Sequence, residues 1–121
     1  MDAWVMAAAL AAGLAIGSAA RAHARLEQAE PAAAAIVKAV PKQLRLRFNE
    51  AVLARFSSVK VTGPAGEAIA VGPAVADAHD KALLVVPLRG ALPAGKYRVE
   101  WSAASSDMHK MRGDYGFTVQ P

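Results

Sequence analysis

The chain has 121 residues, no cysteine, and a formal net charge of +4 at pH 7. A chain of this length usually forms one domain. A chain without cysteine has neither disulfides nor thiolate metal sites, so any metal must be held by nitrogen, oxygen or thioether ligands. The lysines and arginines are scattered rather than clustered with aromatic side chains, which argues against nucleic-acid binding.

The chain begins with an apolar run of small residues, from 3 to 20, which predicts an export signal. The run ends in Ala20-Arg21-Ala22, the small-x-small pattern that signal peptidases cut. A membrane anchor is the alternative, because roughly 18 apolar residues can span a bilayer. The absence of a positive charge before the run is unusual for a signal. We expect residues 1–22 to be a cleaved signal peptide and residues 23–121 to form one domain.

The segment 30–39 is the one part of the expected domain that favours a helix. Pro31 suits a first helical position, the alanines after it are good helix formers, and a helix would stop before Pro41. The same residues fit a loop over one end of a barrel equally well.

Strand patterns dominate the chain after Pro41. Leu44, Leu46 and Phe48 alternate with polar residues and therefore share one face of a strand. Similar patterns predict strands over residues 56–62, 68–71, 81–88, 96–102 and 114–120. Glycine and proline turns separate several of them. About seven short strands of this kind predict an all-β fold, an antiparallel sandwich or Greek-key barrel.

A short motif near the end of the chain carries the donors of a metal site. Asp107 and His109 are separated by one residue, and in an extended segment both side chains would project to the same side and reach one cation. The alternative is a polar loop in which Ser105, Ser106 and Asp107 bond to their own backbone. His79, by contrast, lies in a charged segment and is interpreted as a solvated loop residue.

His23 strengthens the metal interpretation, because cleavage after Ala22 makes it the first residue of the mature protein. An N-terminal histidine offers a free amine and an imidazole to one metal ion. With Asp107 and His109 it forms a nitrogen and oxygen set that suits tetragonal Cu(II), which heads the affinity order of divalent metals. Cleavage after Ala24, which also follows a small-x-small pattern, would discard His23 and the site.

Several segments of the chain resemble the CopC family of periplasmic copper-resistance proteins. They are the start at 23–26, Glu30-Pro31, 46–50, 94–101, 105–109, Gly113 and 117–119. The resemblance implies a cupredoxin- or immunoglobulin-like Greek-key β-barrel. It implies that His23 binds one Cu(II) ion per chain through its amine and ring, and that Asp107 and His109 complete the site. Glu50 stands where the family has a carboxylate near the metal, so it is either a weak or indirect ligand or a surface residue at a strand end.

Two positions depart from the family pattern. Lys110 stands where many members have proline after the last histidine, and a positive charge there would lower copper affinity somewhat. The segment 63–73 contains no methionine, whereas some members bind Cu(I) through a methionine-rich loop. We therefore expect a Cu(II) site only.

The resemblance implies a periplasmic copper carrier or buffer in copper homeostasis and resistance, and not an enzyme. The expected partners are the copper ion, other periplasmic copper proteins and a membrane copper transporter; we expect a monomer and no nucleic acid. One alternative is a copper-dependent oxidative enzyme that uses an N-terminal histidine, although such enzymes are larger and present flat aromatic faces. Another is a metal-free immunoglobulin-like interaction domain, in which replacing Asp107 and His109 would leave metal binding unchanged.

Overall fold

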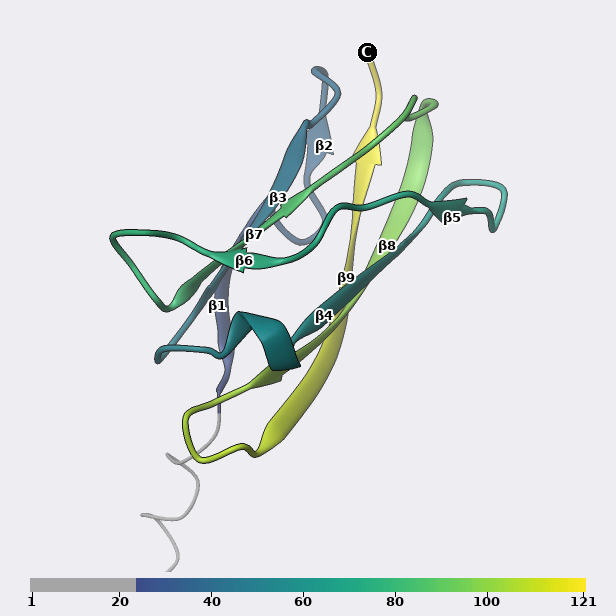
Figure 1. The fold of residues 1–121 in the computed structure, drawn as a ribbon. Coiled ribbons are helices and arrows are strands. Elements are labelled where there is room, and N and C mark those ends of the chain that lie inside the picture. The colour runs from purple at the N-terminus through teal and green to yellow at the C-terminus, as the bar shows by residue number, and fades with distance from the viewer. Residues whose placement is uncertain (1–23) are drawn as a thin grey trace, which may run out of the picture.

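The computed structural model describes residues 24–121, which form two β-sheets packed face to face (Figure 1). The strands are β1 (Leu26–Glu30), β2 (Ile36–Val37), β3 (Gln43–Phe48), β4 (Ser58–Thr62), β5 (Ala68–Ile69), β6 (Val75–Ala76), β7 (Leu83–Pro87), β8 (Gly95–Ala104) and β9 (Lys110–Val119). A 3-10 helix, η3 (Ala54–Phe56), lies between β3 and β4. One sheet has the order β1-β3-β7-β6 and the other β2-β9-β8-β4-β5. The predicted all-β fold is confirmed. Within residues 24–121 no helix has the length and apolarity needed to cross a membrane.

The segment 30–39 contains no helix, so the helical alternative is wrong; the segment is a loop that includes the two-residue strand β2. β1 ends at Glu30, the Glu30–Pro31 peptide bond is cis, and Ile36–Val37 pair in parallel with β9. The Ala34 N–H donates to the Gly116 carbonyl at 2.7 Å, and the Thr118 N–H donates to the Ala35 carbonyl at 2.8 Å. Helix propensity contributes only tenths of a kcal/mol per residue, and pairing with the edge of a formed sheet outweighs it.

The core between the sheets is built from the alternating positions that the sequence pattern predicts. Leu44, Leu46 and Phe48 of β3 are buried. The facing sheet contributes Val61, Tyr97, Val99, Phe117 and Val119, all buried. The Tyr97 and Phe117 rings stack with centroids 5.2 Å apart, and Phe48 meets Trp101 edge to face at the same centroid distance.

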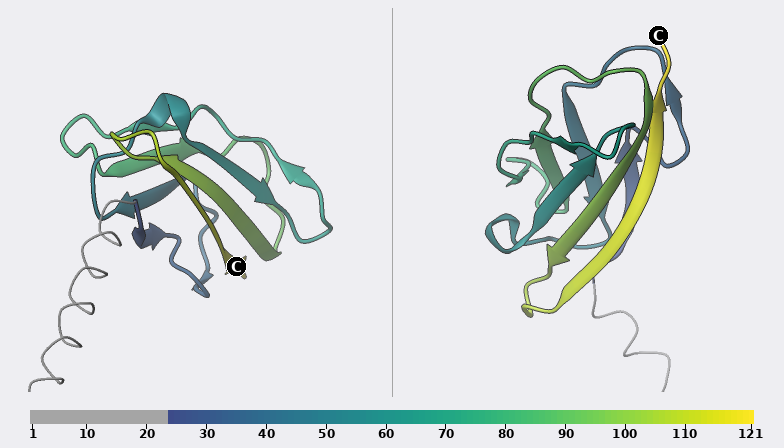
Figure 2. Two further views of the ribbon diagram at one scale, coloured as in Figure 1. Left: turned by 90° about the horizontal axis from the view of Figure 1, so that it is seen from below. Right: turned by 90° about the vertical axis from the view of Figure 1, so that its right-hand side faces the viewer.

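One end of the sandwich gathers the segments that the metal hypothesis needs. The start of β1, the link from β3 to β4 and the turn from β8 to β9 lie together there, whereas the C-terminus lies at the opposite end (Figures 1 and 2). An isolated β-bridge between Val52 and Ser105 ties the link to the turn. The two long strands β8 and β9 pair over their full length, from Gly95–Val119 to Ala104–Lys110. The β8–β9 turn is therefore fixed by the paired strands that lead into and out of it and by the Val52–Ser105 bridge.

Candidate metal centre

The β8–β9 turn, residues 105–109, is folded rather than extended. The Met108 N–H donates to the Ser105 carbonyl at 2.9 Å, and the Ser105 N–H donates to the His109 carbonyl at 3.2 Å. Met108 has a φ of 69°, in the left-handed region. The extended geometry that the spacing of Asp107 and His109 suggested is therefore wrong. The turn brings the two side chains together in another way.

The Asp107 carboxylate is fixed by the turn around it. Its Oδ1 atom accepts a hydrogen bond from the hydroxyl of Ser105, which is fully buried, and another from the His109 N–H at 3.1 Å. Asp107 therefore also bonds to the local backbone, as the polar-loop alternative predicts. This bonding leaves the second carboxylate oxygen, Oδ2, for other partners.

The same contacts hold the pKa of Asp107 well below its ordinary value. The hydrogen bond from Ser105 contributes most, followed by the backbone N–H and then the side chain of His109, and together they lower the pKa to about 2. Hydrogen bonds to the charged form stabilise a carboxylate. Asp107 is therefore an anion at any physiological pH.

Two potential metal donors stand side by side at the surface of the turn. Asp107 Oδ2 lies 2.9 Å from His109 Nδ1, and the two side chains are 42% and 64% exposed respectively. The pair is accessible to an ion from solvent. Met108 and Met111, which flank the pair in sequence, are themselves exposed at the surface.

Within the part of the chain that the structure describes, no further ligand completes a metal site with this pair. No three histidine or carboxylate side chains of residues 24–121 converge on one point. Glu50, which is partly exposed, thus does not form such a cluster with Asp107 and His109. It stands in the β3–β4 link two residues before Val52, which bridges to Ser105. His79 lies in the β6–β7 link, where its N–H donates to Asp77 Oδ2 at 2.9 Å.

His23 lies outside the described residues, but the chain immediately after it is firmly held. Ala24 is 2% exposed and belongs to the core. The Arg25 N–H donates to Asn49 Oδ1 at 2.6 Å, and the Asn49 N–H donates to the Arg25 carbonyl at 3.0 Å. The described chain therefore begins at a fixed point on the end of the sandwich that carries the β8–β9 turn.

Two residues have positioning roles that the sequence analysis did not assign to them. Ser105 is the donor that orients Asp107, and Asn49 is the side chain that anchors the start of the chain. The local sequence indicates a turn, because serine and aspartate bond readily to nearby backbone groups, but the observed bond joins the two side chains instead. Nothing in the local pattern around Asn49 points to a partner 24 residues earlier.

The comparisons with known proteins agree with this fold. A family model described as the CopC domain matches residues 26–120. Protein YobA of Escherichia coli K12 is 43% identical over 99 residues, covering 82% of this chain and 80% of that protein. Copper resistance protein C of Escherichia coli is 38% identical over 123 residues, covering 92% of this chain and 94% of that protein.

A solved structure has the same architecture. The crystal structure of CopC from Methylosinus trichosporium OB3b aligns with a TM-score of 0.75 and 33% identity, covering 82% of this chain and 95% of that one. The resemblance that the sequence motifs indicated is confirmed over almost all of the described residues. On the family model, the curated relatives and the fold together, the chain belongs to the CopC domain family.

Proposed function

We propose that the protein binds one Cu(II) ion per chain in the periplasm and carries or buffers it, without acting as an enzyme. The observation that carries this proposal is the pair of Asp107 and His109, an ionised carboxylate and an imidazole nitrogen 2.9 Å apart on a fixed turn. A relative with 38% identity is named copper resistance protein C, which supports copper as the cargo.

The spacing of the pair suits a tetragonal ion. First-row divalent ions bind nitrogen and oxygen at about 2.0 Å, so two adjacent corners of a square lie about 2.8 Å apart. Asp107 Oδ2 and His109 Nδ1 are 2.9 Å apart. The two donor atoms are therefore already spaced as adjacent corners of a square around one ion, which they would bind once the imidazole rotates to direct its Nδ1 lone pair toward it. Among divalent ions, Cu(II) combines this geometry with the highest affinity for such donors.

Two donors do not make a tight site, and we assign the remaining two to the amine and imidazole of His23. The buried Ala24 and the paired Arg25 anchor the chain next to His23 at the end of the sandwich that holds the turn. The burial of Ala24 also supports cleavage after Ala22, because cleavage after Ala24 would remove a core side chain. Glu50, in the β3–β4 link, is proposed as a weak or indirect ligand.

The protein that exchanges copper with this site is proposed to be a membrane copper transporter or another periplasmic copper protein. An exposed pair on a turn is open to a docking partner, whereas an ion enclosed in the core would not be. A carrier also needs no substrate pocket around the metal. We propose that the protein acts as a monomer.

The test is a Cu(II) titration of protein that begins at His23, beside a version with one added glycine in front. Trp101 is the single tryptophan after residue 22 and reports binding by fluorescence quenching. We expect one-to-one binding, weakened by at least about tenfold in the glycine-extended version, because the added residue displaces the ligating amine. Equal binding by the two versions would remove His23 from the site.

Substitutions test the contribution of the turn to the proposed site, as the glycine extension tests that of His23. Asp107→Asn and His109→Gln should each weaken binding, whereas His79→Gln, which changes a histidine in the β6–β7 link, should not. Unchanged affinity in both turn variants would remove Asp107 and His109 from the site, and the absence of specific Cu(II) binding by any version, wild type included, would favour the metal-free interaction domain. Electron paramagnetic resonance of the copper-loaded protein would count the nitrogen ligands, with three expected.

A further inference from the structure

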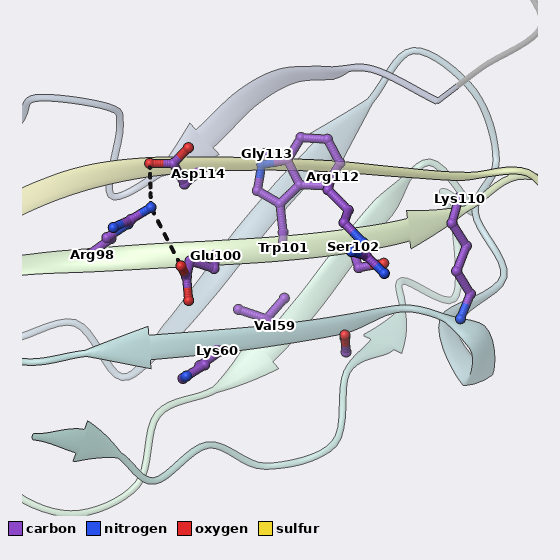
Figure 3. Close-up of a pocket in the computed structure, with 11 residues that line it drawn as sticks. Val59, Lys60, Arg98, Glu100, Trp101, Ser102, Lys110, Arg112, Gly113 and Asp114 are labelled. Carbon is purple, nitrogen blue, oxygen red and sulfur yellow. Dashed lines mark ion pairs between the residues drawn. The ribbon is translucent and has the colours of Figure 1, made fainter.

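A groove on the outer face of the five-stranded sheet has no role in the proposed copper site. It runs across β4, β8 and β9 and has a volume of about 630 Å³. We call it the basic groove and define it by the outward side chains Ser58, Lys60, Arg98, Glu100, Ser102, Lys110, Arg112 and Asp114 (Figure 3). Their neighbours along the strands, such as Val61, Val99 and Tyr115, point into the core.

The charges in the basic groove are unevenly distributed. Glu100 and Asp114 both pair with Arg98, each at 3.4 Å, at the end of the groove away from the β8–β9 turn (Figure 3). Lys60 and Arg112 have no carboxylate within 4.0 Å among residues 24–121.

Lys110, which directly follows His109, likewise has no carboxylate within 4.0 Å in the described part of the chain. Lys110 and Arg112 therefore place unbalanced positive charge in the part of the groove that leads to the turn, whereas Lys60 lies beside Glu100, farther from the turn (Figure 3).

The register of the strands places serine hydroxyl groups next to these cations. Ser58 pairs with Ser102, and Ser102 pairs with Arg112, so two hydroxyls and a guanidinium form one row across three strands. Lys60 lies in the next row beside Glu100. Guanidinium and ammonium groups bind carboxylates well, and serine hydroxyls add neutral donors.

The composition of the groove favours a protein over a uniformly anionic surface. A membrane or a nucleic acid presents a broad surface of phosphates that would cover Glu100 and Asp114 together with the cations, whereas a short peptide segment, even one made of glutamates alone, covers only part of the groove. A protein segment can place carboxylates opposite Lys60, Lys110 and Arg112 and leave Glu100 and Asp114 in water. Complementary charge of this kind steers association and fixes the register of two proteins.

From the charge and the position of the groove, we propose that it docks an acidic segment of the protein that exchanges copper with the Asp107–His109 pair. This inference rests on the proposed copper-carrier function. β8 and β9 continue from the groove into the turn, so a partner held there has its adjoining surface over the exposed pair. Docking thus shortens the path of the ion between the two proteins.

Binding is tested first on the metal-free processed protein, with an octa-glutamate peptide as the probe. Nuclear magnetic resonance shifts should concentrate in β4, β8 and β9 and disappear at high salt, because the Debye length falls to about 3 Å at 1 M. Octa-lysine should produce no such shifts. The variant Lys60→Glu/Arg112→Glu should lose octa-glutamate binding, and Lys38→Glu/Lys42→Glu, with the same change in net charge elsewhere, should retain it.

Copper transfer is tested second, to a Gly-Gly-His peptide with either an octa-glutamate or an octa-serine tail. We expect transfer at low salt to be about tenfold faster with the acidic tail, and the difference to vanish in Lys60→Glu/Arg112→Glu only. Lys110 is left unchanged in that variant because it adjoins His109. Failure of copper binding would leave octa-glutamate binding intact, so the two proposals fail separately.

Two results would overturn the docking proposal. One is octa-glutamate binding that is absent or equally reduced in both charge variants. The other is binding of the metal-free protein to phosphatidylglycerol vesicles, lost in Lys60→Glu/Arg112→Glu, without binding of octa-glutamate. The second result would assign the groove to a membrane surface instead.

Discussion

At the scale of single residues, Ser105 controls the chemistry of its neighbour Asp107. Its buried hydroxyl is the largest cause of the low pKa of that carboxyl group. Ser105→Ala should raise the pKa of Asp107 from about 2 toward its ordinary 3.8 in metal-free protein. Carboxyl titration by nuclear magnetic resonance measures this, and Ser106→Ala, at an exposed position beside it, is the control. An unchanged value would show that the backbone N–H and the side chain of His109 hold the pKa down without Ser105.

The low pKa of Asp107 also predicts a pH dependence of folding. The folded carboxyl group protonates near pH 2, whereas the unfolded one protonates near its ordinary 3.8. The stability that Asp107 contributes is therefore complete above about pH 4 and is lost as the pH falls toward 2. We expect Asp107→Asn to flatten the fall in the free energy of unfolding over this window, measured by urea denaturation. A slope identical to that of the wild type would contradict the assignment.

At the scale of the strands, Gly113 allows Trp101 to pack against β9. The two residues are register partners, and a methyl group at position 113 would lie 2.5 Å from Cζ2 of the Trp101 ring. Gly113→Ala should lower the free energy of unfolding by about 1–3 kcal/mol, because overpacking displaces the ring. Chemical denaturation followed by far-ultraviolet circular dichroism measures it, and the same readout serves variants that lack Trp101.

A second substitution checks the cause of that loss. In Trp101→Leu, which removes the ring, the further change Gly113→Ala should cost markedly less, as a double-mutant cycle would show. The same cost in both backgrounds would mean that the backbone of β9, rather than the ring, requires glycine.

The strands differ in how far the sequence predicts them. β3, β8 and β9 were predictable because strict alternation places their apolar residues in the core. β2 and β6 were not, since each has two residues and is defined by backbone pairing with a neighbour rather than by a local pattern. β1 is an edge strand with only half-buried and exposed residues, so its pattern carries no clear face.

The proximity of Asp107 and His109 was predictable from the sequence, but the geometry that produces it was not. The sequence motif identifies Asp107 and His109, which the structure brings to 2.9 Å. The folded turn that does this depends on the left-handed conformation of Met108 and on the buried hydroxyl of Ser105. Neither follows from a spacing rule, because Ser105 is buried against the rest of the sandwich, to which the Val52–Ser105 bridge ties it, and Met108 adopts its conformation within the closed turn.

At the scale of the whole molecule, copper should stabilise the fold. A ligand that binds the folded chain at 100 times its dissociation constant adds about 2.7 kcal/mol to the free energy of unfolding. We expect a molar excess of Cu(II) over protein to raise the midpoint temperature of thermal unfolding of the processed protein. Asp107→Asn/His109→Gln should show little of this rise. An equal rise in the variant would place the stabilising ion elsewhere.

The meeting of the chain start and the β8–β9 turn at one end has a topological consequence. In the proposed site a single ion joins residue 23 to residues 107 and 109, and so closes a loop of roughly 85 residues in a chain that has no cysteine. Cross-links that close long loops restrict the unfolded ensemble most. The cargo would then do for this domain what a disulfide does for many exported ones, and delivering it would open the loop again.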